Sequence, residues 1–366
     1  MDRNTVEIEL LKYEHVRPYT PDQSKVIEKY KDGSFGVSNL AFALYSNGNS
    51  LRGKSQEHPF GLLYEDGETL FSIGYYRKVL DTNDSPGYLM IVAPRGKEAV
   101  RKAIDFSNKV LGNERIQSKG VYMRFLTLNQ YLETLNSGFL PVKESPWHPE
   151  APEEDETYNN SIISIDDLLT TNSVGIISVN LIRCKNRNSR RKARDGYKRF
   201  KNFLERNNLK YSLIALTKEK IRDAKEVIDF HFEILRGKGK TIGSTPEDHY
   251  NSLDPEILAM SGISAYIGYL GKQPVSIFVG ESLSSNKFAL YTPFTIRDAT
   301  LLNFELLDEK GFSAMPLYSY LQLFAKLREE GIREVHLGGS EFPDLNLFKR
   351  QLGGKSEISY WAIKLK

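Results

Sequence analysis

The stretch HLGGSEFPDLNLFKRQLGG, residues 336–354, decides the fold of this chain. One Gly-Gly pair follows an apolar run, and a second follows a short amphipathic segment that contains a Lys-Arg step. Glycine adopts left-handed backbone conformations at little cost, so it commonly ends strands and helices. We therefore expect a strand that ends at Gly338, a turn, and a short helix that stops at Gly353.

The residues before this stretch predict a long helix preceded by three strands. In MPLYSYLQLFAKLREEG, residues 315–331, apolar side chains are spaced for one buried helical face, with Pro316 in the first turn and Gly331 as the stop. Residues 264–296 are typical of an antiparallel meander with turns at Gly-Lys and Ser-Ser-Asn. Further elements are expected as helices at about 189–206 and 218–235 and as one final strand at 357–365.

The first half of the chain repeats this order in a shorter form. Residues 60–76, FGLLYEDGETLFSIGYY, predict a hairpin around Asp66 and Gly67, and residues 87–94 predict a buried strand that leads into a helix over 95–112. The segment SPWHPEAPEEDETYNNS, residues 145–161, combines prolines with an acidic run, as linkers do. It divides the chain into expected domains 1–160 and 161–366, the alternative being an acidic loop within one domain.

Composition excludes several classes of protein. With 40% hydrophobic and 27% charged residues, the 366-residue chain matches an average globular protein. It has no apolar run of membrane-spanning length and no signal peptide, so we expect a cytoplasmic protein without an integral membrane segment. The single cysteine, Cys184, excludes an internal disulfide, and six scattered histidines show no metal-ligand spacing. We expect no metal site.

The order of strand meander, long helix, strand, short helix and strand is that of the GNAT acyltransferase fold. The C-terminal half resembles the Fem-type aminoacyl transferases and the C-terminal catalytic domain of the phosphatidylglycerol lysyltransferases, both of which join two GNAT-like domains. The resemblance implies an α/β fold of two tandem GNAT-like domains with mixed, mostly antiparallel sheets. Its motifs are SRRKARDGYKRFKNFLERNNLKYSL (189–213), FHFEILRGKGKTIGSTPEDHYNSL (230–253), LYSYLQLFAKLREEGIREVHLGGS (317–340) and LFKRQLGG (347–354).

The element LFKRQLGG is similar to the family's F-K-x-x-F-G, with Leu352 where phenylalanine is usual. Over the first 160 residues the likeness is only in outline.

Basic residues gather just before the second half of the chain. On the helix expected at 189–206, Arg191, Arg194, Lys198 and Lys201 recur at three- and four-residue steps, which suits phosphates, although a solvated helix face fits the same pattern. Resemblance to transferases that use charged tRNA favours RNA. Further phosphate or tRNA contacts are expected from the RGKGKTIG segment, at Arg236, Lys238 and Lys240, although an ordinary basic loop fits the same residues.

RGKGKTIG is not a typical coenzyme A loop. The pyrophosphate loop of acetyl-CoA enzymes, R/Q-x-x-G-x-G/A, lies between a strand and a helix N-terminus. Here the last position is Thr241, and the segment follows a helix. PRGKEAV, residues 94–100, has the right context but lacks the glycines. A conventional CoA site is therefore not expected.

The opening stretch supplies the expected reaction site. Gly338 and Gly339 lie where a GNAT sheet opens, and their lack of side chains lets a substrate approach the backbone closely. The remaining candidates for this site lie beside the pair, in the F-K-x-x-F-G-like element or near the start of the preceding helix, and a core or surface role is open for the lysine and the tyrosines. They are Glu341 as a proton acceptor, Lys349 as a cation for a phosphate or acyl oxygen, and Ser340, Tyr318 and Tyr320 as lining side chains.

Together these features predict an acyltransferase that moves an amino acid from aminoacyl-tRNA to an amine or hydroxyl acceptor. The acceptor is a small molecule, a peptide or a lipid headgroup, and no cofactor is needed because the tRNA ester is already activated. Two alternatives stay open. One is an N-acyltransferase that uses an acyl thioester of CoA or a carrier protein, and the other is a non-catalytic RNA-binding protein of the same fold.

Overall fold

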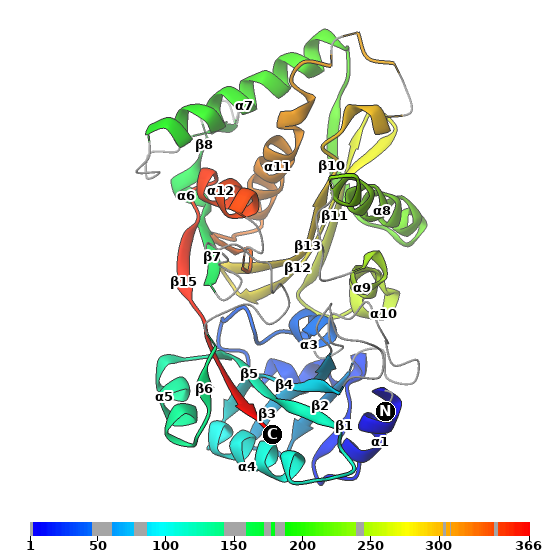
Figure 1. The fold of residues 1–366 in the computed structure, drawn as a ribbon. Coiled ribbons are helices and arrows are strands. Elements are labelled where there is room, and N and C mark those ends of the chain that lie inside the picture. Colours follow the sequence, from blue (N-terminus) through cyan, green and yellow to red (C-terminus); the bar gives the residue numbers. More distant parts are fainter. Residues whose placement is uncertain are drawn as a thin grey trace. The chain divides into compact units, whose positions relative to one another are not determined.

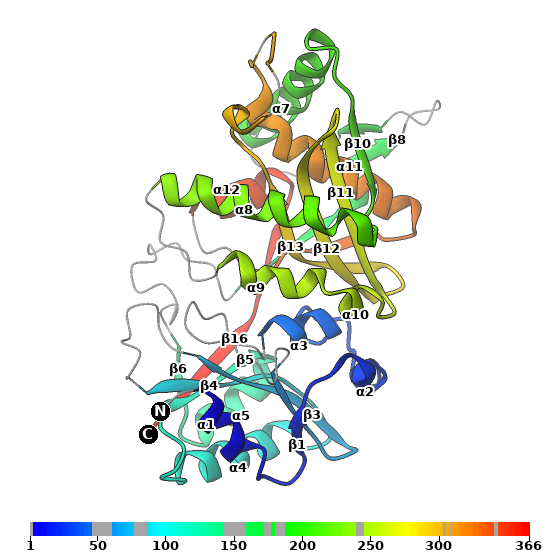
Figure 2. The ribbon, with the colours of Figure 1, turned by 90° about the vertical axis from the view of Figure 1, so that its right-hand side faces the viewer.

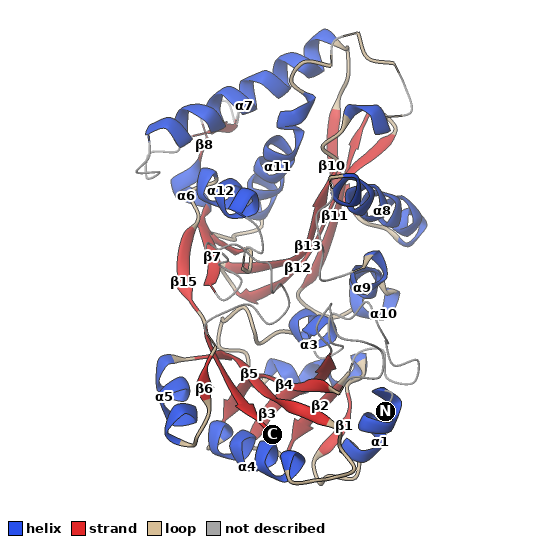
Figure 3. Cartoon of the chain, viewed as in Figure 1, coloured by secondary structure: helices blue, strands red, loops and turns tan. Residues whose placement is uncertain are grey.

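Two α/β units make up the part of the chain that the computed structural model describes (Figures 1 and 3). The described residues are 3–45, 61–76, 86–142, 159–171, 177–179, 187–238, 245–302, 305–307, 309–339 and 343–366. Unit 1 comprises Met1–Asn159, Gly243–Ser252 and Ile358–Lys366, and unit 2 comprises Asn160–Ile242 and Leu253–Glu357. Each unit contains a seven-stranded sheet.

The sheet of unit 1 is antiparallel except for the pair β4 and β5. Its strands, in spatial order, are β1 (Val16–Pro18), β2 (Leu62–Glu65), β3 (Thr69–Tyr76), β4 (Gly87–Gly96), β5 (Ser118–Leu126), β16 (Tyr360–Leu365) and β6 (Leu140–Pro141). The helices are α1 (Arg3–Leu10), η1 (Pro21–Gln23), α2 (Ser24–Glu28), α3 (Asn39–Tyr45), α4 (Ala99–Leu111), α5 (Leu128–Asn136) and α9 (Pro246–Tyr250).

The expected elements of unit 1 are confirmed. β2 and β3 form the hairpin, and Asp66 ends it by accepting the backbone N–H groups of Glu68 at 3.0 Å and Thr69 at 2.8 Å, as aspartate does in turns. The predicted strand and helix correspond to β4 and α4. The helix buries one apolar face against the sheet, and this face consists of Val100, Ala103, Ile104, Phe106 and Val110.

The sheet of unit 2 follows the predicted meander. Its strands, in spatial order, are β10 (Tyr211–Ala215), β11 (Ile263–Leu270), β12 (Gln273–Ser284), β13 (Lys287–Thr295), β14 (Glu334–His336), β7 (Asn159–Ser164) and β15 (Lys355–Ile358), and β8 (Leu169–Thr171) pairs with β9 (Ile177–Val179). The helices are α6 (Ile165–Leu168), α7 (Arg187–Arg206), η2 (Lys218–Lys220), α8 (Ile221–Gly237), η3 (Asn251–Leu253), α10 (Pro255–Leu258), η4 (Ala299–Leu301), η5 (Phe312–Ala314), α11 (Met315–Glu329) and α12 (Pro343–Gln351).

Helices cover both faces of the unit 2 sheet (Figures 1 and 2). On one face lies α8, whose Phe232 packs 5.8 Å from the ring of Phe294 on β13. On the other face lies α11, whose Tyr320 packs 5.1 Å from the ring of Phe278 on β12. α7 packs on the outer side of α11, and α12 lies beside α11. A hydrophobic core cluster of the unit is formed between α11 and the sheet.

One expectation about the end of the chain is wrong. The stretch 357–365 was expected as a single strand because its apolar residues alternate, but it is divided at Ser359 between two sheets. β15 ends the unit 2 sheet beside β7, whereas β16 lies between β5 and β6 of unit 1. Alternation shows which side chains share a face, but it cannot show which sheet the strand joins.

Candidate functional site

The sheet of unit 2 opens between β13 and β14. These parallel strands pair at only three positions, the last being Ala289 with His336. β13 then continues to Thr295, paired with β12 on its other edge, while the chain leaves β14 at Leu337. Along 290–295, no described strand takes the β14 side of β13. Ligands of open α/β sheets bind where neighbouring strands diverge at their carboxyl ends, so this position is the candidate site.

A glycine turn directly follows β14 at the opening. Gly338 has a φ of 64°, in the left-handed region where a side chain would be strained. The turn is tied to β7: Leu337 N–H donates to Ser161 O at 2.8 Å, and Ser161 N–H donates to Gly338 O at 3.0 Å. Within the described residues, the Gly339 N–H has no hydrogen-bond acceptor. The first glycine pair therefore forms a fixed turn, as its position in the sequence predicted.

Lys349 holds the turn from the other side. It lies on α12 and is only 5% exposed. Its ammonium group donates to the carbonyl oxygens of Leu337 at 2.9 Å, Gly338 at 3.1 Å and Gly339. An ammonium group has three N–H bonds, so these carbonyls match its donors in number. The predicted partners of Lys349 were a phosphate or an acyl oxygen, whereas in this structure its partners are the backbone of the turn.

A buried histidine lies at the end of β14. His336 is 2% exposed, and its Nε2 lies 2.8 Å from Glu334 Oε1, while its Nδ1 lies 2.7 Å from Asn160 Nδ2. Burial lowers the pKa of His336 below its usual value of 6.5, against the opposing effect of Glu334. Asn160 also accepts the Gly338 N–H at 3.1 Å. Sequence reasoning missed this pair, because 176 residues separate its members.

The two candidate tyrosines occupy different places in unit 2. Tyr320 is buried, with its ring 5.2 Å from that of Phe348 on α12, and burial raises its pKa. Tyr318 instead stacks on Tyr197 of α7 at 5.2 Å, and burial raises its pKa to about 12. Tyr318 therefore joins α11 to α7, while Tyr320 packs beside the helix that carries Lys349.

α7 separates an apolar face from a basic one. Ala193, Phe200 and Phe203 are buried against the unit, whereas the four predicted contacts are exposed. These contacts are Arg191, Arg194, Lys198 and Lys201, and we call them the α7 stripe. On a helix of 3.6 residues per turn they fall within about 80° of one another. No ion pair joins any of them to a described residue, so the stripe is a free cationic surface within this part of the chain.

Two further predicted contacts, Arg236 and Lys238, are not brought together with the stripe. Arg236 and Lys238 are exposed at the C-terminal end of α8, on the opposite face of the sheet from α7 (Figures 1 and 2). Backbone amides do not face an anion at a helix C-terminus, so only these side chains are available for a phosphate. Lys240, Ser340 and Glu341 lie outside the described residues.

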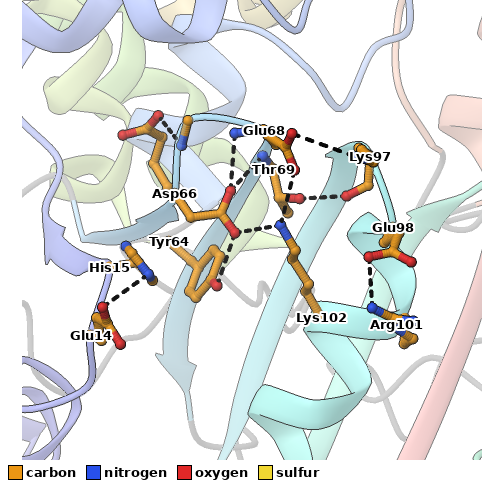
Figure 4. Close-up of polar contacts among 12 residues, drawn as sticks. Glu14, His15, Tyr64, Asp66, Glu68, Thr69, Lys97, Glu98, Arg101 and Lys102 are labelled. Atoms are coloured by element: carbon orange, nitrogen blue, oxygen red, sulfur yellow. Dashed lines mark hydrogen bonds and ion pairs between the residues drawn. The ribbon is translucent and has the colours of Figure 1, made fainter.

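Neither unit presents a coenzyme A loop of the usual kind in its described part. In unit 1 the turn between β4 and α4 is occupied by the β2–β3 hairpin (Figure 4). Lys97 N–H donates to Glu68 O at 3.0 Å, and Thr69 Oγ1 donates to Lys97 O at 2.7 Å. Lys102 of α4 pairs with Asp66 of the hairpin at 2.6 Å. The Lys97 N–H of this turn is therefore already hydrogen-bonded within the protein and is not available to a pyrophosphate.

In unit 2 the start of α11 is covered by α7. A Cβ atom placed on Gly311 would lie 2.7 Å from the carbonyl oxygen of Arg199, so the backbone before α11 runs directly against α7. Phe312 of η5 packs 5.7 Å from the ring of Phe203, also on α7. An anion therefore cannot reach this helix start as it reaches the N-terminus of an open strand-to-helix turn.

The described residues show neither a metal site nor a membrane-spanning helix. No group of three or more His, Cys, Asp or Glu side chains in the described ranges has the arrangement of a metal site. Among the helices of the described part, none is long and apolar enough to cross a bilayer.

Comparison with known proteins identifies the fold. No protein-family model and no curated protein sequence matches the chain. Among solved structures, a conserved protein of unknown function from Bacteroides thetaiotaomicron matches with a TM-score of 0.62 at 14% identity, covering 96% of this chain and 99% of that one. FemX matches with a TM-score of 0.55 at 10% identity, covering 96% and 97%. The chain has the tandem GNAT-like fold.

The same fold extends to L-PGS from Bacillus licheniformis, which matches with a TM-score of 0.54 at 12% identity over 96% of this chain and 94% of that one. The resemblance to the Fem-type and lysyltransferase groups is thus confirmed at the level of the fold, over nearly the whole chain. The fold class of two mixed sheets flanked by helices is confirmed with it.

Proposed function

We propose that this protein is an aminoacyltransferase that takes an amino acid from aminoacyl-tRNA and transfers it to an amine or hydroxyl acceptor. The observation that carries the proposal is the α7 stripe. Four exposed cations lie on one side of α7, and the other side of this helix packs into the core of unit 2. The same unit contains the open edge of β13. A row of lysine and arginine gains affinity for a polyphosphate by releasing its counterions.

The chemistry asks little of the protein beyond position. A neutral amine attacks the ester carbonyl carbon of the aminoacyl-tRNA, and the new C–N bond forms as the C–O bond to the terminal ribose breaks. The proton lost by the amine goes to the ribose oxygen, which leaves as a hydroxyl. Holding the two reactants in line supplies much of the rate, and a fixed N–H donor stabilises the oxyanion of the tetrahedral intermediate. We assign that donor to Gly339, whose N–H has no acceptor among the described residues.

This assignment replaces Lys349 as the group that stabilises the oxyanion. Two roles at the turn then fall to backbone groups, substrate approach at Gly338 and donation at Gly339, while the side-chain ammonium of Lys349 keeps the turn rigid. Glu341 stays a candidate for receiving the proton. The occupied turn of unit 1 and the covered start of α11 favour a tRNA ester over a CoA thioester as the donor.

A transfer assay tests the proposal. Aminoacyl-tRNAs carrying labelled amino acids are incubated with the protein and an extract of small metabolites, peptides and lipids, and label is followed into products that survive RNase. We expect protein-dependent transfer that disappears when the tRNA is digested first. Transfer from acyl-CoA that is indifferent to RNase contradicts the proposal in favour of the thioester enzyme. Binding of tRNA with no transfer in any acceptor fraction contradicts it in favour of an RNA-binding protein.

A further inference from the structure

A series of polar contacts, buried at its inner end, leads from the surface of unit 2 to the glycine turn. Lys287 pairs with Glu334 at 3.0 Å, and Glu334 contacts His336 at 2.8 Å. His336 contacts Asn160 at 2.7 Å, and Asn160 accepts the Gly338 N–H at 3.1 Å. His336 and Asn160 are 2% and 5% exposed, so water does not replace these contacts easily. These contacts join β13, β14 and β7 at the opening of the sheet.

The backbone N–H of Gly338 determines which atom donates and which accepts at each contact in this series. Because Gly338 N–H can only donate, the side-chain atom of Asn160 that faces it is the oxygen. The Asn160 NH₂ group therefore faces His336 Nδ1, which has to accept. The imidazole is then neutral with its proton on Nε2, and this proton is donated to Glu334. A protonated His336 directs its Nδ1–H toward the NH₂ group of Asn160, so the hydrogen bond between the two side chains is lost.

We propose that Asn160 and His336 are positioning residues that hold the Gly338–Gly339 turn in its reactive shape only while His336 is neutral. Protonation of His336 forces the Asn160 amide to turn its oxygen toward the ring. Asn160 then faces Gly338 with its NH₂ group, and the turn loses the acceptor for its N–H. The inference about turn geometry stands on the contacts alone, whereas its consequence for turnover rests on the proposed function.

Charged groups on three strands of the unit 2 sheet act on His336. Glu334 on β14 and Glu357 on β15 favour the protonated ring, while Lys287 on β13 and burial favour the neutral ring. Burial is the largest of these effects and keeps the pKa of His336 below 6.5. Glu357 also lies 3.4 Å from Asn160 Nδ2, so it contacts the second N–H of the same amide. The switch therefore operates only below pH 6.5, with the turn intact at pH 7.

Nuclear magnetic resonance of the free full-length protein tests the inference. The ring nitrogens of His336 are observed with ¹⁵N-labelled histidine, and exchange of the Gly338 amide is followed with ¹⁵N-labelled glycine. We expect His336 as the Nε2–H tautomer at pH 7.5. After correction for intrinsic exchange, we expect protection of Gly338 to fall at least tenfold as His336 becomes protonated. An Nδ1–H tautomer, or protection that does not change as the ring titrates, overturns the inference.

Three variants separate positioning from folding. In Asn160→Ala, Gly338 exchange should rise at least tenfold at pH 7.5. In Asn160→Asp, the carboxylate still accepts the Gly338 N–H and now faces His336, so protection should persist while the pKa of His336 rises. His231→Gln, at a partly buried histidine elsewhere in unit 2, should leave Gly338 unchanged. Equal exchange in Asn160→Ala and the unsubstituted protein, or a lower pKa in Asn160→Asp, contradicts the assignment.

These readouts need no tRNA and no acceptor, so they are independent of the proposed function. If transfer is also found, Asn160→Ala should reduce turnover about tenfold or more and leave tRNA affinity unchanged, since the α7 stripe is intact. A loss of affinity with unchanged turnover contradicts a positioning role. If the turn behaves as expected and no transfer occurs, the proposed function fails, but the positioning role of Asn160 and His336 stands.

Discussion

Replacing Lys349 by methionine tests how strongly the glycine turn is held. Methionine keeps an unbranched side chain of similar length but removes the ammonium, which leaves the carbonyl oxygens of Leu337, Gly338 and Gly339 without this donor. A hydrogen bond to a charged group contributes about 1.5 to 3 kcal/mol net, so three bonds set an upper range of about 5 to 9 kcal/mol. Removing a buried ammonium also recovers several kcal/mol of desolvation, on the order of half that range. We expect Lys349→Met to destabilise unit 2 by about 2 to 4 kcal/mol.

The assay is hydrogen exchange measured peptide by peptide at increasing urea concentrations, which reads the unfolding free energy of unit 2 separately from that of unit 1. Lys355→Met is the matched control, because it removes an exposed lysine from the neighbouring strand β15 and should change stability by less than about 0.5 kcal/mol. If Lys349→Met changes unit 2 no more than this control does, the ammonium does not hold the turn and the reasoning is refuted.

Two further predictions concern backbone strain and pH. Gly96→Ala should destabilise unit 1 by about 3 kcal/mol or more in the same exchange assay, because the new Cβ would lie 2.0 Å from Glu68 O. Gly67→Ala, at a similar positive φ in open space, should destabilise it by only about 1 kcal/mol. Equal destabilisation by the two variants contradicts the steric argument. Burial lowers the pKa of His231 from 6.5 to about 4. As pH falls, the unfolded chain therefore binds a proton at His231 before the folded chain does. The free energy of unfolding of unit 2 should decrease on the order of 2 kcal/mol between pH 6.5 and pH 4, and His231→Gln should abolish this decrease in urea titrations. The same pH dependence in the variant contradicts the prediction.

Local patterns predicted most elements of the fold because those elements are decided by neighbouring residues. The periodicity of residues 315–331 and the stop at Gly331 gave α11, and the Asp66–Gly67 turn gave the first hairpin. The destination of a strand is not a local property. Nothing within residues 357–365 distinguishes β15 from β16, because the partners that separate them, β7 and β5, lie far away in the sequence.

The candidate site was predictable only in part for the same reason. The Gly338–Gly339 pair is visible in the sequence because glycine is required at a positive φ. The partners that fix it are not visible. Asn160 gives no signal in a polar segment, and a lysine in a short helix is typical of a solvated surface, although Lys349 is buried. The amphipathic pattern of α7 did predict the exposed stripe, because burial of one helical face leaves the other to solvent.

The measurement that tests the central claim most directly is binding of aminoacylated tRNA at several salt concentrations. The protein is compared with the Arg191→Ala, Arg194→Ala, Lys198→Ala triple variant and with a control triple on η2 and α8, Lys218→Ala, Arg222→Ala, Lys225→Ala. We expect affinity to fall with salt, and the slope of log K against log salt to decrease by about 2 to 3 in the stripe variant, since each lost phosphate contact removes about 0.7 to 0.9. The control triple should keep the original slope. Absence of tRNA binding, or an equal loss of slope in both triples, contradicts the account.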